Sequence, residues 1–189
     1  MSTRSSLRER ILDAASELFY RHGIRAVGVD TLIARSGVAK MSFYKYFASK
    51  DALVVAFLTR RDERWRAWLR AAVERRATEP RARLLAVFDT LDEWFRSPEF
   101  RGCAFVNAAS ELADRAHPAY RAVVEHKQRV EAYLRELAHA SGVRDPEALA
   151  RRLLLLMDGA IVTAQIAGTP GAAREARAVA AALIASAAS

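Results

Sequence analysis

Apolar side chains recur at helical spacing along most of the chain, and no run alternates strictly enough between apolar and polar residues to indicate a β-strand. In the first such run, Leu7 and Ile11 lie on one face of a helix. Ser5 or Ser6 can cap the start of this helix, and Gly23 can end it in the left-handed conformation. The pattern therefore predicts an all-α protein.

Proline residues divide the rest of the chain, and none occurs before Pro80. Ser97, Asp145 and Thr169 stand directly before three of the five prolines. A capping side chain followed by proline is a helix-start signal, because the N–H that proline lacks has no partner in the first turn. These signals predict nine helices, over residues 5–22, 31–36, 40–46, 50–77, 80–96, 98–113, 118–140, 146–167 and 171–187.

Two of the predicted helices, residues 31–36 and 40–46, lie on either side of Gly37, which is free to take a positive φ at a sharp turn. Two short helices around a glycine turn form the helix-turn-helix pattern. Phe43, on the second helix, and Phe47, one turn further along the chain, can pack onto the first. The pattern predicts a DNA-binding unit near the N-terminus.

Lysine is rare except beside this turn. The 30 Lys+Arg residues comprise 4 lysines and 26 arginines, and Lys40, Lys45 and Lys50 follow one another at intervals of five. Met41 and Ser42 share with Lys45 the side of the predicted helix opposite the phenylalanines. Serine and lysine can bond base edges, methionine can touch thymine methyl groups, and a flexible ammonium suits phosphate. This window favours DNA binding over the plainer alternative, a helical hairpin with a solvated polar face.

The net charge of +8 is concentrated in the first third of the chain, since residues 1–60 hold 10 Lys+Arg and 5 Asp+Glu, a net of +5. Such charge attracts polyanions, although an arginine-rich composition can also reflect a GC-rich genome. The single cysteine, Cys103, rules out an internal disulfide framework. Neither a signal-peptide core nor an uninterrupted apolar run of about 20 residues is present. We expect a cytoplasmic protein, associated with the nucleoid when it is bound to DNA.

The stretch GIRAVGVDTLIARSGVAKMSFYKYFASKDAL, with the helix before it, closely resembles the DNA-binding region of the TetR family of bacterial transcriptional regulators. The resemblance covers residues 7–55. Its signature is carried here by Gly37-Val38, Phe43-Tyr44, Tyr46-Phe47 and Lys50-Asp51. It implies an all-helical homodimer that binds double-stranded DNA. By the family pattern, the DNA-contacting positions are Thr31, Lys40, Met41, Ser42, Tyr44, Lys45, Tyr46 and Lys50.

Two positions depart from this pattern. Asp30 has the wrong charge to contact phosphate and is expected instead to cap the helix that follows it, leaving Thr31 and backbone N–H groups for the phosphate. Ala39 stands where many relatives carry serine, and losing that cap would cost the recognition helix roughly 1 kcal/mol.

The charge shift near residue 50 divides the chain into a three-helix DNA-binding domain, residues 1–50, and a larger helical domain, residues 51–189. The helix predicted over residues 146–167 is apolar on nearly every face from Leu153 to Ile166, and that part must be buried on all sides. The last helix carries small residues that permit close approach. These two helices would form a four-helix homodimer interface across residues 146–187, as the resemblance also implies; the alternative is internal core. A two-fold dimer would read a palindromic operator, with half-site centres about 34–36 Å apart or a multiple of that.

Large aromatic side chains gather in the middle of the chain, interrupted by a few polar ones. Apolar walls with converging polar groups are typical of a small-molecule pocket between bundle helices, although ordinary core explains each residue taken singly better than a pocket does. The segment RGCAFVNAASEL also resembles one effector-domain subgroup of the family. We expect an apolar or aromatic effector to be bound by Trp65, Trp68, Phe88, Trp94, Phe105, Asn107, Ser110 and Glu111.

Other classes of protein explain less of the sequence. It has no G-x-S-x-G, P-loop, H-E-x-x-H or G-x-G-x-x-G motif, so we predict no enzyme and no cofactor. His117, Glu125 and His126 lack the spacing of a metal site on one helix. A nonspecific architectural DNA binder would not need the aromatic-rich domain, and a helical adaptor would not need the lysines. We predict a repressor that a small molecule releases from DNA, with activation as the alternative outcome.

Overall fold

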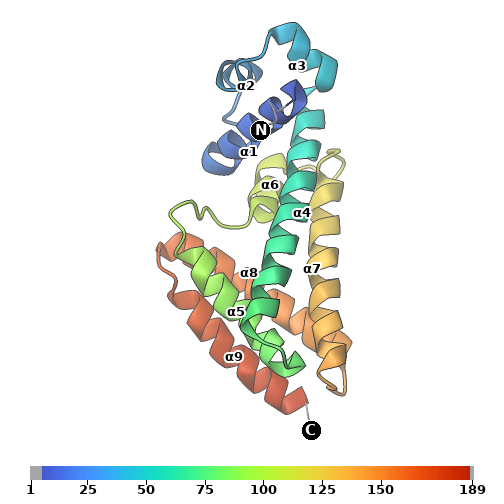
Figure 1. Cartoon of the computed structure of the whole chain (residues 1–189), viewed down its shortest axis with the longest axis vertical. Coiled ribbons are helices and arrows are strands. Elements are labelled where there is room, and N and C mark those ends of the chain that lie inside the picture. The colour runs from blue at the N-terminus through green and yellow to red at the C-terminus, as the bar shows by residue number, and fades with distance from the viewer. Residues whose placement is uncertain (1–5, 188–189) are drawn as a thin grey trace, which may run out of the picture. The chain divides into compact units, whose positions relative to one another are not determined.

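A computed structural model describes residues 6–187, and this part of the chain contains nine helices and no strand, which confirms the all-α prediction. The helices are α1 (Leu7–His22), α2 (Val29–Ser36), α3 (Lys40–Tyr46), α4 (Lys50–Arg76), α5 (Pro80–Phe95), α6 (Ala104–Leu112), α7 (Tyr120–Ala140), α8 (Pro146–Ala167) and α9 (Gly171–Ala187) (Figure 1).

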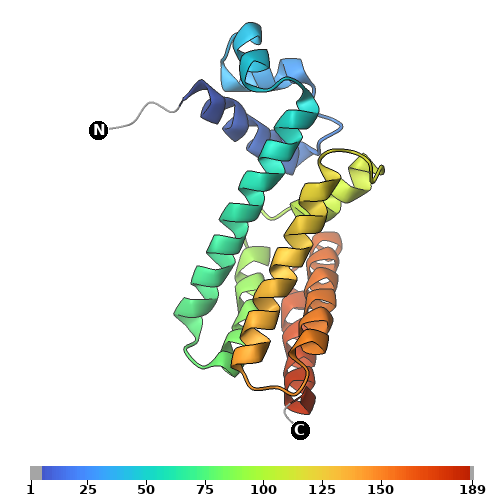
Figure 2. The same cartoon turned by 90° about the vertical axis from the view of Figure 1, so that its right-hand side faces the viewer.

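The helices belong to two compact units. One unit comprises the chain up to Glu63 together with Ala104–Glu125, and so contains α1, α2, α3 and α6. The other comprises Arg64–Cys103 together with the chain from His126 onward, and contains α5, α8 and α9. The helices α4 and α7 each contribute residues to both units (Figure 2). The domain division near residue 50 stays a prediction.

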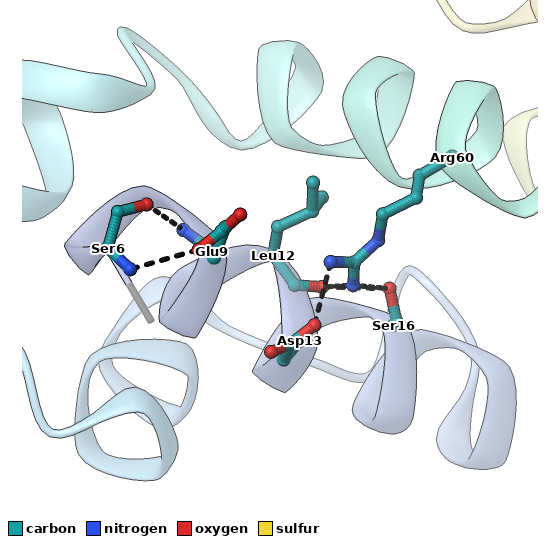
Figure 3. Close-up of polar contacts among 6 residues, drawn as sticks. All are labelled: Ser6, Glu9, Leu12, Asp13, Ser16 and Arg60. Carbon is teal, nitrogen blue, oxygen red and sulfur yellow. Dashed lines mark hydrogen bonds and ion pairs between the residues drawn. The ribbon is translucent and has the colours of Figure 1, made fainter. Parts of the chain in front are cut away.

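The start of α1 is fixed by a capping box. The backbone N–H of Glu9 donates to Ser6 Oγ at 3.3 Å, and the N–H of Ser6 donates to Glu9 Oε2 at 2.9 Å (Figure 3). The prediction of Ser6 as the cap is confirmed, while the other candidate, Ser5, lies outside the described residues. Gly23 ends the helix with φ 87°, but its ψ of 159° is extended, so the predicted left-handed helical conformation is wrong.

The helix α2 begins at Val29, two residues earlier than expected. Its cap position is Gly28, and no side chain caps the helix there, so the predicted capping role of Asp30 is wrong. Asp30 lies within the first turn, where its carboxylate is favourable to the helix dipole and lies 3.8 Å from Lys40 Nζ. Gly37 takes the left-handed conformation, with φ 63° and ψ 32°, as the turn requires. Ala39 offers α3 no side-chain cap, as expected.

The helix α6 begins at Ala104, not at residue 98. After Pro98 the chain turns tightly instead, with the N–H of Phe100 donating to Ser97 O at 3.0 Å. Gly102 then takes φ 76°, which a right-handed helix cannot include. By contrast, Asp145 caps α8 through the N–H of Ala148 at 2.9 Å, as predicted.

The helices α5, α8 and α9 pack against one another (Figure 1). Leu153 and Met157 of α8 are buried in this bundle. Other α8 side chains are not, since Leu155 is 74% exposed and Ile166 is 83% exposed in the single chain. The burial on all sides that the sequence predicted for α8 is therefore absent within one chain.

Candidate nucleic-acid interface

The helix α3 presents two chemically distinct faces. Phe43 and Phe47 are buried, with ring centroids 6.4 Å apart, and they anchor the helix beside α1. Burying two phenylalanines is worth about 3–6 kcal/mol in transfer free energy, which is ample to hold a helix of two turns. Met41 is 86% exposed, and Lys45 is exposed too. The α3 residues that do not pack into the core are therefore available to a partner.

Most of the predicted DNA-contacting residues are exposed. Thr31 on α2 is exposed, and Ser42 and Lys50 are half-buried. The exposed members of the set on α3 are Lys40, Met41, Tyr44, Lys45 and Tyr46. Ammonium, hydroxyl, phenol and thioether groups on one short helix can reach base edges and phosphate oxygens in a major groove.

The turn between α2 and α3 is held by an arginine from α1. Arg10 Nη2 donates to the carbonyl oxygens of Ser36 and Gly37, at 2.8 and 3.1 Å. The last carbonyls of a helix lack partners within it, so this guanidinium satisfies groups that would otherwise need water. A Cβ built on Gly37 would lie 2.8 Å from Arg10 Nη2, and this close approach adds a second reason for glycine. Arg10 and Ser36 lie 26 positions apart in the chain, which explains why sequence reasoning missed Arg10.

A second arginine ties α4 to α1. Arg60 Nη2 donates to Leu12 O at 2.6 Å and to Ser16 Oγ at 2.5 Å, and its Nη1 lies 2.7 Å from Asp13 Oδ1 (Figure 3). Phe57, one turn earlier on α4, packs edge to face against Phe19 of α1 with centroids 5.6 Å apart. These contacts fix α1, and hence the turn that Arg10 holds, to the first half of α4.

Some of the residues predicted to bind an effector lie on α6, in the same unit as α1–α3. Phe105 is buried and Asn107 is half-buried. Ser110 Oγ donates to Val106 O of its own helix at 3.1 Å. Glu111 instead contacts the turn after α1, where its Oε2 accepts from the N–H of Arg25 at 2.8 Å. Sequence reasoning missed this contact.

The other predicted effector residues belong to the second unit. Trp65, Trp68 and Trp94 contact one another, with ring centroids 5.6 to 6.3 Å apart. Phe88 is fully buried. The structure thus brings the three tryptophans together, and the ligand-binding role of all eight residues stays a prediction.

No group of three or more His, Cys, Asp or Glu side chains among the described residues is arranged to hold a metal ion. Across the same residues, no helix has the length and apolarity needed to cross a membrane.

A left-handed glycine between two short helices, a buried phenylalanine pair and a polar, lysine-bearing outer face define a helix-turn-helix DNA-binding protein. Residues 11–57 match the family model described as "Bacterial regulatory proteins, tetR family", and residues 80–180 match "Tetracyclin repressor-like, C-terminal domain". The chain belongs to the TetR family and is a DNA-binding transcriptional regulator, as the resemblance implied.

Known relatives agree with this assignment. The crystal structure of SCO4454, a TetR-family transcriptional regulator from Streptomyces coelicolor, is 32% identical, covers 97% of this chain and 96% of its own, and has a TM-score of 0.89. The transcriptional regulator AcuR from Cereibacter sphaeroides is 31% identical over 84% of this chain and 76% of its own. The transcriptional repressor NemR from Escherichia coli is 30% identical, but that match spans only 59% of this chain and 57% of NemR. The family and these relatives are transcriptional regulators rather than enzymes.

Proposed function

We propose that this regulator is a ligand-responsive repressor, which binds a palindromic operator as a homodimer and leaves it when a small molecule binds. The observation that carries the proposal is the outer face of α3, on which Met41 and Lys45 stand free while Phe43 is buried behind them. The name of NemR as a repressor favours repression over activation. The site of action would be the cytoplasm, on nucleoid DNA.

Different residues of the interface would have different tasks. Lys45, Ser42 and Met41 project from the middle and start of α3 and would read base edges. Lys50, at the start of α4, would contact a phosphate, where a lysine acts as a flexible point charge. Thr31 and the free N–H groups in the first turn of α2 suit a second phosphate, because no side chain caps that helix.

The homodimer would form through α8 and α9. Leu155, Gly159, Val162 and Ile166 follow the helical spacing of four, three and four residues, and so form one stripe on α8. In the single protomer Leu155 and Ile166 are largely exposed, and a Cβ added at Gly159 would meet nothing within 4 Å. An exposed apolar stripe with a glycine at its centre favours close packing of a second helix. The partly exposed Val179 extends the apolar surface onto α9.

Release by a ligand requires that the two units be coupled. The helix α4 runs without interruption from Lys50, beside the recognition helix, to Arg76 in the second unit. A ligand that shifts α4 would change the spacing of the two recognition helices in the dimer. To release DNA it must favour the non-binding state by a few kcal/mol, on the order of 5 kcal/mol for an almost complete shift.

The experiment is a binding titration with palindromic DNA, beginning with the region upstream of the protein's own gene, across a salt series with random DNA as competitor. Tight binding by a dimer that resists the competitor supports the proposal. If random DNA removes the protein from every sequence equally, and selection from a random pool enriches no palindrome, the protein is a nonspecific architectural binder. The same assay then screens small molecules for release of the DNA.

A further inference from the structure

All three tryptophans of the chain meet in one aromatic cluster. Trp65 and Trp68 come from α4, Trp94 from α5 and Phe100 from the turn that follows it. Trp65 touches both other indoles, and Trp94 meets Phe100 edge to face at 5.0 Å between centroids. We call these four residues the tryptophan cluster.

The cluster has a buried side and an open side. Trp65 is only 9% exposed, and the ring of the buried His126 lies 5.6 Å from it. Trp68, Trp94 and Phe100 are half-buried, so each residue is partly exposed to solvent. Trp94 contacts the rings of both Trp68 and Phe100, so an aromatic molecule that reached these residues would find neighbouring rings for stacking or edge-to-face contact.

A polar group inside the cluster has no partner. The indole Nε1–H of Trp65 is fully buried, and no atom of the described residues accepts its hydrogen bond. A buried donor without an acceptor costs roughly 1–3 kcal/mol, and buried indoles usually find one. The Trp65 N–H therefore favours a ligand that carries a hydrogen-bond acceptor.

The charges around the cluster decide what kind of acceptor fits. Arg96 is paired with Asp92, and Arg101 donates to the carbonyl oxygens of Pro98 and Phe100. Lys127, next to His126 in the chain, is paired with Asp158 at 2.5 Å. A carboxylate brought to Trp65 would thus lose its hydration while Arg96 and Lys127 are already paired with carboxylates, which is costly. A neutral oxygen avoids that cost.

We propose that the tryptophan cluster binds a flat, uncharged aromatic compound, whose carbonyl oxygen accepts a hydrogen bond from Trp65 Nε1. Because this N–H is fully buried, the oxygen reaches it only when a neighbouring side chain moves. This inference rests on the proposed function in one respect, because the compound would be the effector. It goes further by naming the chemistry that the effector must carry.

The test compares two probes that differ in one group, 9-fluorenone, which carries a carbonyl, and fluorene, which does not. Their affinities for the full-length protein are measured by calorimetry and by quenching of tryptophan fluorescence, which reports on the cluster alone. We expect Trp65→Phe to lower the ratio of fluorenone affinity to fluorene affinity about fivefold to tenfold, as the loss of one hydrogen bond predicts. The two probes differ in their free energy of transfer from water. This difference is the same for wild type and variant, so it cancels when their affinity ratios are compared.

Trp68→Phe is the matched control, because it removes an indole N–H from the same cluster while leaving that of Trp65 in place. It should leave the ratio unchanged. If Trp65→Phe fails to fold, the three indole N–H signals of the ¹⁵N-labelled wild-type protein serve instead. Fluorenone should move the Trp65 signal strongly and fluorene should not, with assignments taken from Trp68→Phe and Trp94→Phe.

The outcomes separate the inference from the proposed function. Failure of both probes to bind, an equal ratio in wild type and Trp65→Phe, or equal shifts of the Trp65 signal overturns the inference, while operator binding still tests the regulator. If fluorenone binds with the expected ratio but does not weaken operator binding, the ligand site stands and control of DNA through it is disproved.

Discussion

The carboxylate of Glu111 accepts a hydrogen bond from the backbone N–H of Arg25 at 2.8 Å, although 86 residues separate the two in the chain. The same carboxylate lies where a side chain on Gly23 would have to be, since a Cβ there would come within 2.9 Å of Glu111 Oε2. The turn that joins α1 to α2 is thereby packed against the end of α6 and hydrogen-bonded to it. Any displacement of α6 would act directly on the DNA-reading helices.

Glu111→Ala should therefore weaken operator binding and lower the unfolding free energy by about 1 kcal/mol, because it leaves a turn N–H to water in place of a charged acceptor. Chemical denaturation and operator titration measure the two effects. Ser110→Ala, which removes only a bond to its own helix, should change neither. Equal behaviour of the two variants would show that the Glu111 contact does not order the turn.

Lysine substitutions should separate backbone contacts from base contacts. Lys50→Ala should weaken binding to all DNA alike and reduce the slope of log affinity against log salt by about one unit, since it removes one phosphate contact. Lys45→Ala and Ser42→Ala should instead change the preference among operator variants. Competition binding on a set of single-base changes provides the measurement. If all three variants gave the same binding profile, the proposed distinction between a phosphate contact by Lys50 and base contacts by Ser42 and Lys45 would be wrong.

Arg60 should matter more to stability than its position on a long basic helix suggests. Its guanidinium serves a backbone carbonyl, a hydroxyl and a carboxylate at once, and its side chain is only 15% exposed. Arg60→Lys keeps the charge but cannot reproduce this fork, so we expect a loss of about 2 kcal/mol in unfolding free energy. The exposed Arg64, changed to lysine, is the control. If Arg60→Lys lost less unfolding free energy than Arg64→Lys, water would be able to replace the contacts of the Arg60 guanidinium without cost.

The sequence was informative where the determinant of structure is local. Asp145 and Pro146 start α8 through contacts within four residues, and Gly37 forms its turn by its own freedom of φ. The helix boundaries predicted from the sequence are wrong where a distant or competing contact determines the local structure. Pro98 resembles a helix start, yet a tight turn and the positive φ of Gly102 delay α6 to Ala104.

The candidate site shows the same division. The alternation of buried and exposed residues on α3 follows from its helical period, so Phe43 and Met41 could be assigned to opposite faces in advance. Arg10 and Arg60 could not be singled out, because their acceptors are mostly backbone carbonyls and leave no mark on the sequence. The chain has 26 arginines, and the three-dimensional structure is needed to tell those that hold the turn and α1 in place from those that are exposed on the surface.

Tyr133 should make stability depend on pH in the alkaline range. Burial raises the pKa of Tyr133 to about 12, and the nearby Arg70 guanidinium only partly offsets this effect. The pKa is about 10 in an unfolded chain, so the folded state holds the proton more tightly. The stability from the neutral phenol is complete below pH 10 and is lost as pH rises towards 12.

The measurement for Tyr133 is the absorbance of tyrosinate in wild type minus that in Tyr133→Phe, which we expect to rise with a midpoint near pH 12. Tyr133→Phe should also lose less unfolding free energy than wild type between about pH 10 and pH 12, the range between the pKa of the unfolded and the folded phenol. A difference titration centred near pH 10 would contradict this assignment.

Gly159→Leu should stabilise the single chain while breaking the proposed dimer. Within one protomer a side chain at this position meets nothing within 4 Å, and replacing an exposed helical glycine gains about 0.5–1 kcal/mol of helix propensity. In a four-helix interface the same leucine would occupy the space of the partner's helix at the point of closest approach. Sedimentation should therefore show monomers, and operator affinity should fall at least tenfold because each monomer binds only a half-site. Arg135→Leu, which adds leucine to the exposed surface of α7, should remain dimeric. A dimeric Gly159→Leu protein would show that the stripe on α8 is not the interface.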